Sequence, residues 1–145
     1  MGRMNDSPAP ITPVKSTVYF DRTYRETMTL LVETRDYMRF REPADRGALP
    51  DDHRLAVNCE ALRLTSRLTH IMAWLLIQKA VHAGEISAAE AAGDDHRLAG
   101  QSVCRARNAA SGVSMPPALE ALLERSYQLY ARVERLDALA ARAIH

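Results

Sequence analysis

Small and apolar residues recur at steps of three and four along the C-terminal part of the chain. The positions in this repeat are Leu119, Leu122, Ser126, Leu129, Val133, Leu136, Ala140 and Ala143. Such spacing brings the side chains to one face of an α-helix and is typical of a seam between packed helices. Ser114, Pro116 and Pro117 precede the repeat and favour a helix start. We therefore expect a helix from this point nearly to the C-terminus, packed lengthwise against other helices.

A helix is also predicted from Ser16 to about Arg41, because apolar residues again recur at helical spacing. Its main face carries Phe20, Tyr24, Met28, Leu31, Arg35 and Met38, and a second line of Tyr19, Leu30 and Tyr37 lies roughly opposite. Pro43 and Gly47 then interrupt the pattern. Residues 1–15 are rich in proline and small residues, so we expect them to form a flexible N-terminal segment.

The longest predicted helix lies between these two. Pro50, followed by Asp51 and Asp52, is typical of a helix N-terminus, and Gly84 is well suited to end the helix after Ala83. At ~1.5 Å per residue this helix is about 50 Å long. It is therefore the central element of the expected fold.

A less regular stretch connects the long middle helix to the last one. Ser87 and Glu90 have the spacing of a capping box, which predicts a short helix over residues 88–92. Residues 93–115 lack apolar periodicity, and a loop of this length is usually functional or mobile. No strand pattern competes with the helices. We predict an all-α, antiparallel three-helix bundle with long helices, a short extra helix and a long loop between helices two and three, forming one domain over residues 16–145.

Composition limits what such a bundle could bind. The chain has 145 residues and 47% hydrophobic content, which is enough to build a core. Its 19 basic and 18 acidic residues create no strong field for nucleic acid or an anionic membrane. No secretory signal or membrane-spanning stretch is recognisable, and Cys59 and Cys104 lie far apart. These features predict a cytoplasmic protein with reduced thiols.

The middle helix has more apolar surface than two neighbouring helices would cover. One side carries Leu64, Leu68, Met72, Leu75 and Leu76, and another carries Leu55, Cys59, Leu62 and Ala73. The remaining side carries Trp74, Ile77 and Val81 in line with Arg63, Arg67 and His70. A helix that is apolar all round must be covered all round. Either residues 85–115 fold back over this side, or a second copy of the chain covers it.

These last six residues are therefore candidate partner-binding residues, and a homodimer is expected. Trp and Arg are enriched at the centres of protein interfaces. Two other interpretations stay open. Trp74 could belong to the core, and Arg63 and Arg67 are well placed for ion pairs within the chain, with Glu60 or with the last helix.

Residue patterns that support catalysis are sparse. The Glu-x-x-His pairs of di-iron bundles do not occur, and neither does a phosphate-binding or dinucleotide-binding glycine pattern. Cys104 lies beside Arg105 and Arg107, whose charges favour a thiolate, yet no base accompanies it in the sequence. A possible metal-binding set comprises His82, Glu85, Asp94, Asp95 and His96. A solvated polar loop explains that set more simply, so we predict no catalytic residue, no cofactor and no metal.

Specific runs of residues are similar to a known family. The middle helix carries Glu60-Ala-Leu-Arg-Leu-Thr-Ser-Arg-Leu, then Trp74-Leu-Leu-Ile-Gln, and closes with Gly84-Glu85-Ile86. The last helix carries Leu123-Glu124-Arg125-Ser126, Leu129-Tyr130, Arg132-Val133 and Arg135-Leu136-Asp137, and the first helix carries Tyr24, Glu26, Leu31 and Asp36-Tyr37. Over about residues 18–140, the chain resembles the regulator of CtrA degradation (RcdA-like) family of alphaproteobacteria.

This resemblance implies a three-helix bundle that tends to form homodimers and has no enzyme activity. It also implies an adaptor that helps deliver substrates, such as a cell-cycle transcription regulator, to the ClpXP protease. The sequence therefore favours a non-enzymatic protein-binding adaptor. The alternative is a small-molecule- or metal-binding helical bundle that uses the His82 to His96 set. A DNA-associated regulator is disfavoured by the near-neutral charge.

Overall fold

Three long helical segments make up most of the structure, a computed structural model that describes residues 13–107 and 113–144. The first comprises α1 (Pro13–Asp36), a π-helical turn η1 (Tyr37–Arg41) and the short helix α2 (Glu42–Gly47). The others are α3 (Asp51–His82) and α6 (Pro117–Ile144). Between these two lie the single turns α4 (Ala88–Ala91), η2 (Asp94–His96) and α5 (Gln101–Cys104). The described residues contain no strand, which confirms the predicted all-α bundle.

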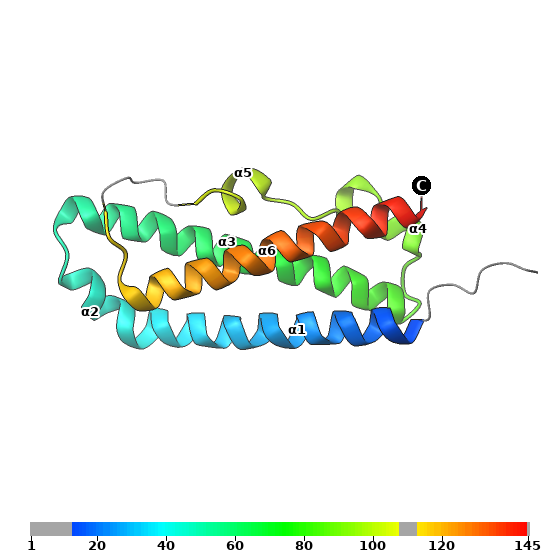
Figure 1. The fold of residues 1–145 in the computed structure, drawn as a ribbon, viewed down its shortest axis with the longest axis horizontal. Coiled ribbons are helices and arrows are strands. Elements are labelled where there is room, and N and C mark those ends of the chain that lie inside the picture. The colour runs from blue at the N-terminus through cyan, green and yellow to red at the C-terminus, as the bar shows by residue number, and fades with distance from the viewer. Residues whose placement is uncertain (1–12, 108–112, 145) are drawn as a thin grey trace, which may run out of the picture.

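The three long segments lie side by side along the length of the molecule (Figure 1). Arg132 on α6 pairs with Glu26 on α1, and Arg125 pairs with Glu33, so α1 runs antiparallel to α6. Hydrogen bonds join Arg67 to Ser126 and Trp74 to Asp137, so residue numbers rise together along α3 and α6. The predicted antiparallel packing therefore holds for α1, whereas α3 and α6 are parallel.

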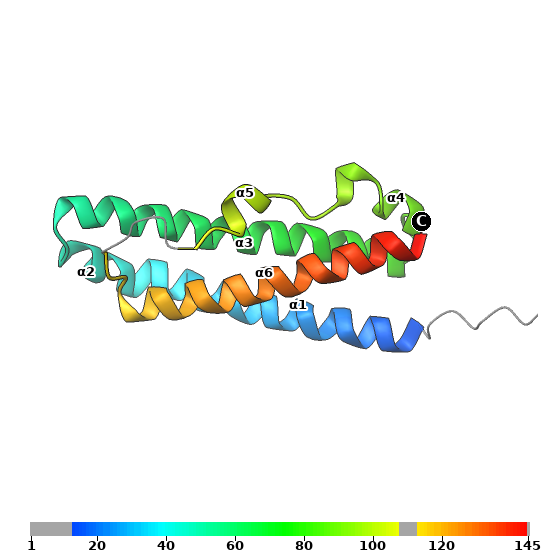
Figure 2. The same ribbon diagram turned by 45° about the horizontal axis from the view of Figure 1, so that its top comes forward.

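A long connection makes this parallel pair possible. We call residues 83–116 the crossover segment, of which 83–107 and 113–116 are described. It leaves the end of α3, returns along the outside of α3 and α6, and joins the start of α6 (Figures 1 and 2). Its contacts follow α6 in reverse order, from Arg97 at Asp137 to Arg107 at Glu124. Much of the predicted loop over 93–115 is therefore packed against the bundle.

The buried face of α1 is largely formed by threonine. Its inward positions follow steps of four and three and comprise Thr23, Thr27, Leu30 and Thr34, and Tyr37 at the start of η1 continues this face. The Thr27 hydroxyl donates to the Thr23 carbonyl at 2.8 Å, so this buried hydroxyl is satisfied within the helix. A threonine bonded in this way can pack much as a small branched apolar residue does.

This threonine face differs from the main face predicted for the first helix. Met28 and Arg35, both on the predicted face, are exposed. Leu30 and Tyr37 from the predicted second line are buried, and the Tyr19 side chain lies outside the described residues. Residues 1–12 of the predicted flexible segment also lie outside them, and α1 already begins at Pro13.

The π-turn shifts the buried face of the first segment by one residue. After Tyr37 the next buried position is Glu42, five residues on, whereas Arg41 stays exposed. Pro43, expected to interrupt the helix, lies in the first turn of α2. A proline is tolerated there because the first N–H groups of a helix have no partner within it. The helical segment therefore continues to Gly47.

The ends of α3 and α4 follow the predicted signals. Gly84 takes a left-handed conformation with φ 75°, and the Glu85 N–H donates to the Ala80 carbonyl at 2.9 Å. This hydrogen bond is typical of a glycine-terminated helix. The Ser87 hydroxyl accepts the N–H of Glu90 at 3.0 Å, which confirms the predicted cap of α4.

The core lies between α3, α6 and α1. From α6 it receives Leu119, Leu122, Ser126, Leu129, Tyr130 and Val133, and from α3 mainly Val57, Leu64, Leu68, Ile71, Trp74 and Leu75. The predicted seam of α6 is therefore confirmed through Val133. Beyond this residue the face turns slightly, so that Asp137 and Ala141 are buried while Ala143 is exposed.

Candidate protein-binding surface

Two of the six residues predicted to bind a partner lie inside the protein. Trp74 is 2% exposed and Arg67 is 1% exposed. The other four, Arg63, His70, Ile77 and Val81, are half-buried. The crossover segment covers this side of α3, which was the first of the two covers considered from the sequence. Trp74 and Arg67 are thus inaccessible to another protein in this structure.

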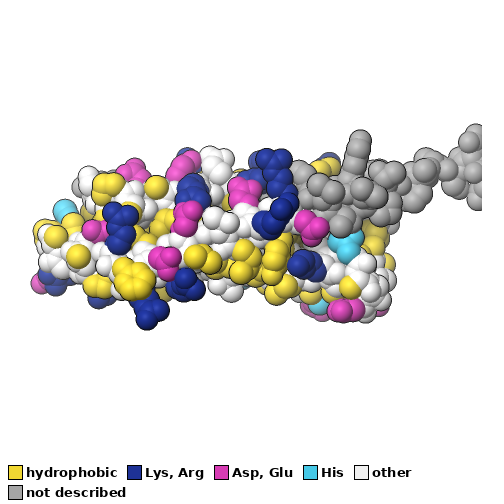
Figure 3. Space-filling model, turned by 90° about the horizontal axis from the view of Figure 1, so that it is seen from below, with side chains coloured by type: hydrophobic (Ala, Val, Ile, Leu, Met, Phe, Trp, Pro, Cys, Tyr) yellow, Lys and Arg dark blue, Asp and Glu magenta, His cyan; other side chains and the backbone are white. Residues whose placement is uncertain are grey.

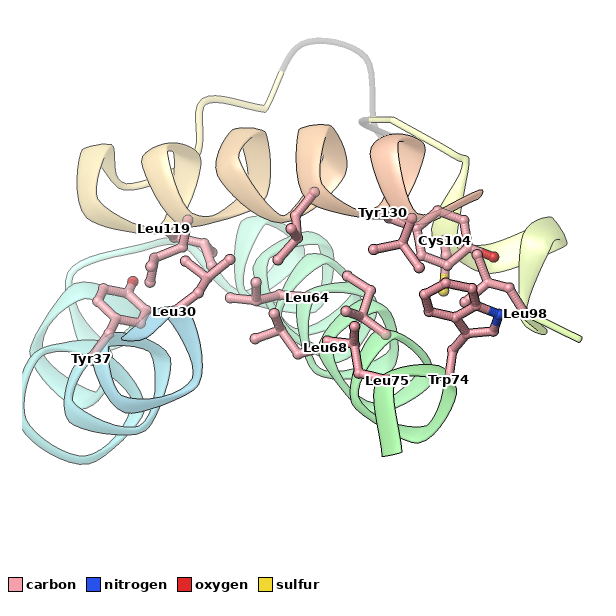
Figure 4. Close-up of a cluster of buried hydrophobic side chains, with 14 of the residues drawn as sticks. Leu30, Tyr37, Leu64, Leu68, Trp74, Leu75, Leu98, Cys104, Leu119 and Tyr130 are labelled. Carbon is pink, nitrogen blue, oxygen red and sulfur yellow. The ribbon is translucent and has the colours of Figure 1, made fainter. Parts of the chain in front are cut away.

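Trp74 is held by a buried carboxylate. Its indole Nε1–H donates to Oδ1 of Asp137 at 2.9 Å, and its ring lies 5.7 Å from that of Phe20. Arg97 of the crossover segment donates from Nε to both oxygens of the same carboxylate, at 3.0 and 2.9 Å. Figure 4 shows Trp74 next to Leu98, inside the cluster of buried side chains. These contacts support the interpretation of Trp74 as a core residue.

Arg67 fixes the other end of the crossover segment. Its guanidinium donates to the carbonyls of Cys104 at 2.9 Å, Ala106 at 2.7 Å and Leu123 at 2.9 Å, and to the Ser126 hydroxyl at 3.1 Å. Burial lowers the pKa of this guanidinium. The four acceptors offset the cost of burying a charge by replacing bonds to water. Arg67 therefore has a structural explanation that needs no partner.

Arg63 and His70 also contact the crossover segment. Arg63 forms an ion pair with Glu60 and donates from Nε to the Val103 carbonyl at 3.0 Å, which confirms the predicted pairing within the chain. Gly100 has φ +83°, and a Cβ at this position would lie 2.5 Å from Cδ2 of His70. Only glycine allows this close approach without strain.

Cys104 is a buried thiol and does not form the activated nucleophile considered from the sequence. Its Sγ lies 3.7 Å from the Ser66 hydroxyl, and burial raises the pKa of the thiol despite nearby arginines. Arg105 and Arg107 point elsewhere, each to a glutamate of α6. The environment therefore favours the neutral thiol, which is a poor nucleophile.

The residues considered as metal ligands do not form a cluster. His82, Glu85, Asp94 and Asp95 are exposed and His96 is half-buried. The His82 ring lies 5.3 Å from the ring of Phe20. Across residues 13–107 and 113–144, no group of three or more His, Cys, Asp or Glu side chains is placed to hold a metal ion. The geometry gives no support to the metal-binding alternative.

The apolar surface that remains open on α3 lies opposite the core. We call it the outer α3 face, and it comprises Leu55, Cys59, Leu62, Thr69, Ala73 and Leu76. Leu55 is 68% and Leu62 is 70% exposed. From the sequence, five of these residues were assigned to neighbouring helices, Leu76 to one and Leu55, Cys59, Leu62 and Ala73 to another, whereas the structure leaves all five exposed. An uncharged face with exposed leucines at regular helical spacing is typical of a protein contact surface.

The same exposed leucines raise the question of a membrane-spanning helix. None of the helices in the described ranges is long and apolar enough to cross a bilayer.

A protein family and a solved structure are similar to this chain along most of its length. The model of the family described as "Protein of unknown function (DUF1465)" matches residues 12–144. Among solved structures, the crystal structure of RcdA from Caulobacter crescentus CB15 is similar with a TM-score of 0.69 and 34% sequence identity. The match covers 83% of this chain and 89% of that chain. A comparison with curated protein sequences finds no match.

Proposed function

Because the chain belongs to the RcdA-like DUF1465 family, we propose that it is a non-enzymatic adaptor that helps deliver substrates to the ClpXP protease. The likeness to RcdA along most of both chains is the observation that carries this proposal. The substrates would include a cell-cycle transcription regulator such as CtrA. The adaptor would act in the cytoplasm, where such a regulator binds DNA.

The site geometry supports protein binding rather than catalysis. The Cys104 thiol is buried, and this burial favours its neutral form. The buried guanidinium of Arg67 donates to carbonyls of its own chain. The outer α3 face is instead a regular exposed apolar surface without charged residues. Such a surface can bind another helix but offers no group for acid–base chemistry.

We also propose that the chain forms a homodimer through the outer α3 face. This face spans 22 residues from Leu55 to Leu76, about 32 Å of helix, which is enough for a helix-to-helix interface. The proposal moves the contact from Trp74 to a different side of α3, since Trp74 is covered by the crossover segment. Arg63, His70, Ile77 and Val81 stay candidates for contact with other partners, because they are partly exposed.

A reconstituted degradation assay tests the adaptor role. Purified ClpX and ClpP would be mixed with CtrA, with and without this protein and the other adaptors of the system. The proposal expects severalfold faster loss of CtrA when the protein is added, and its retention by immobilised protease, adaptor or substrate. If neither the protease, its other adaptors nor any substrate is retained at micromolar concentration, the adaptor role is refuted.

Light scattering tests the homodimer. The wild-type protein is expected at twice the 16.2 kDa mass of the chain. Leu62→Asp places a charge in the outer α3 face and should give a folded monomer. Leu139→Asp, at a leucine of α6 that is 55% exposed, is the matched control and should remain dimeric. A wild-type monomer at about 100 μM would contradict the homodimer.

A further inference from the structure

An apolar groove lies between η1 and the first half of α6. It encloses about 420 Å³, and its apolar lining includes Tyr37 and Phe40 from η1 and Ala118, Ala121 and Leu122 from α6. This volume is in the range of pockets that receive a small ligand or a side chain or two of a peptide. Its lining residues come from η1 and the start of α6, which lie at the end of the bundle next to α2 (Figure 1).

Two features of the sequence keep the groove open. Ala118 and Ala121 are small, so α6 leaves space beside η1 at these positions. The π-turn leaves Arg41 outside the core, at the edge of the groove, and buries Glu42 in its place. π-helical turns are uncommon and are frequently found at functional sites.

The groove has an exposed aromatic wall. Phe40 is 67% exposed, and the guanidinium of Arg39 lies 5.2 Å from the centre of its ring. Figure 3, which views the molecule from the α1 side, shows exposed apolar side chains next to basic ones on this face. Exposed aromatic and arginine side chains in contact are enriched where proteins bind one another.

The charge around the groove is net positive, because Arg35, Arg39, Arg41 and Arg125 outnumber Glu33, Asp36 and Asp45, whose carboxylate accepts the Tyr37 hydroxyl at 3.0 Å. Glu33 pairs with Arg125 across the groove, and Asp36 pairs with Arg35 at 3.1 Å. Arg41 lines the groove and forms no ion pair with any described residue. Arg39 likewise forms no ion pair within the described ranges, and its guanidinium lies over the Phe40 ring. Two cations thus remain available beside an apolar floor.

We propose that this groove binds a short acidic segment of a partner protein that inserts one bulky apolar side chain. The apolar residue fills the space over Leu122 and against Phe40, and Asp or Glu residues on either side meet Arg39 and Arg41. The inference rests on the proposed function in one respect, namely that the chain works by binding proteins. It adds the chemistry of the bound segment and a second surface besides the outer α3 face.

Binding of synthetic peptides to the full chain tests this inference. The probes are ten-residue fluorescein-labelled peptides of Asp, Glu and Gly with a central leucine or phenylalanine. Matched peptides carry serine at the centre or amides in place of the carboxylates. Fluorescence anisotropy should detect binding of at least one acidic apolar peptide below about 1 mM, and each matched peptide should bind at least about tenfold more weakly.

Two variants locate the binding. Ala121→Trp fills the groove from an exposed position, and Arg41→Glu reverses one of the available charges; each should weaken peptide binding at least about tenfold. Arg22→Glu makes the same charge change on the exposed surface of α1 and should change the affinity for the peptide by less than about twofold. Circular dichroism checks that all three variants are folded. The inference is overturned if neither acidic peptide binds, or if both groove variants bind it as the wild type does.

The result is separable from that of the adaptor assay. If the protein accelerates degradation by ClpXP but the groove variants keep full peptide binding, the groove inference fails and the proposed function stands. If the groove variants lose the peptide while the wild type has no effect on ClpXP, the groove inference holds and the proposed function fails.

Discussion

The carboxylate of Asp137 binds the indole N–H of Trp74 inside the bundle, at 2.9 Å, and so joins the C-terminal halves of α6 and α3. The same carboxylate receives Arg97, which brings the crossover segment to this point. A single acidic residue therefore connects three parts of the chain that are distant in sequence.

Replacing Asp137 should destabilise the protein. Asp137→Ala leaves the buried indole N–H without an acceptor and is expected to cost about 2–4 kcal/mol of the free energy of unfolding. Asp137→Asn keeps an oxygen for Trp74 but loses the charge opposite Arg97, and should cost less than the alanine variant. Urea unfolding followed by fluorescence reports on this site directly, because Trp74 is the only tryptophan. Equal stability of Asp137→Ala and the wild type would contradict the role of this carboxylate.

Replacing Arg67 should also destabilise the protein, because Arg67 holds the crossover segment against the bundle. Arg67→Met keeps the apolar stem but leaves the carbonyls of Cys104, Ala106 and Leu123 without their donor. We expect a loss of about 3 kcal/mol in urea unfolding, together with faster proteolysis in the crossover segment. Arg105→Met removes an exposed ion pair with Glu134 and is the matched control, for which little change is expected. Similar effects of both substitutions would argue against a special role of the buried guanidinium.

The two cysteines should differ sharply in reactivity. Cys59 is exposed, whereas Cys104 is buried with a raised thiol pKa. In the monomeric Leu62→Asp variant, in which the outer α3 face is free, one thiol per chain should therefore react rapidly with a disulfide reagent at pH 8, and the second at least about 100-fold more slowly, through local opening. In Cys59→Ser only the slow reaction should remain, and urea should abolish its protection. Rapid reaction of both thiols in the folded protein would show that the crossover segment does not cover Cys104.

Stability should decrease in alkaline solution. Burial raises the pKa values of the Tyr37 and Tyr130 phenols, and Tyr130 donates its hydroxyl to the Ala99 carbonyl at 2.8 Å. As the pH rises through about 10, the usual pKa of tyrosine, the unfolded chain loses these protons while the folded protein keeps them. The free energy of unfolding should thus be retained below this pH and fall above it. Burial also raises the pKa of the Cys104 thiol, so a smaller fall should start near pH 9, where the thiol ionises in the unfolded chain.

Tyr130→Phe separates the two effects of that hydroxyl. At pH 7 the variant should lose about 1 kcal/mol, because the Ala99 carbonyl loses its donor. Above pH 10 its stability should fall less steeply than that of the wild type. Urea unfolding at intervals between pH 7 and 11 provides the comparison. An unchanged slope would mean that Tyr130 ionises as readily in the folded protein as in the unfolded chain.

Helical periodicity identified the long helices but not all of their buried faces. The regular repeat of α6 predicted its seam as far as Val133, because leucine, valine and serine at helical spacing leave little ambiguity. In α1 the buried face contains Thr23, Thr27 and Thr34, and an apolar count overlooks threonine, whose hydroxyl can be satisfied by the backbone of its own helix as that of Thr27 is. Faces formed by threonine could be found by treating it as a small branched residue.

The candidate surface was harder to predict because α3 is apolar on several sides. Periodicity cannot tell which of these sides the chain itself covers. The crossover segment covers Trp74 through Arg97 and Leu98, leaving Leu55 and Leu62 exposed. The groove beside Phe40 had no sequence signal, since it depends on a π-turn and on two alanines of a distant helix. The direction of α6 was signalled only by the length of the connection before it.

The parallel course of α3 and α6 sets a minimum length for the polypeptide between them. A return along the 28 residues of α6, about 42 Å, requires about 13 residues even when fully extended. A deletion that left a connection of hairpin size would force α6 to reverse or to come from another chain. Surface connections are usually the places where tags and insertions are best tolerated. Here residues 97–107 are poor choices for either, because their backbone and side chains complete the interior.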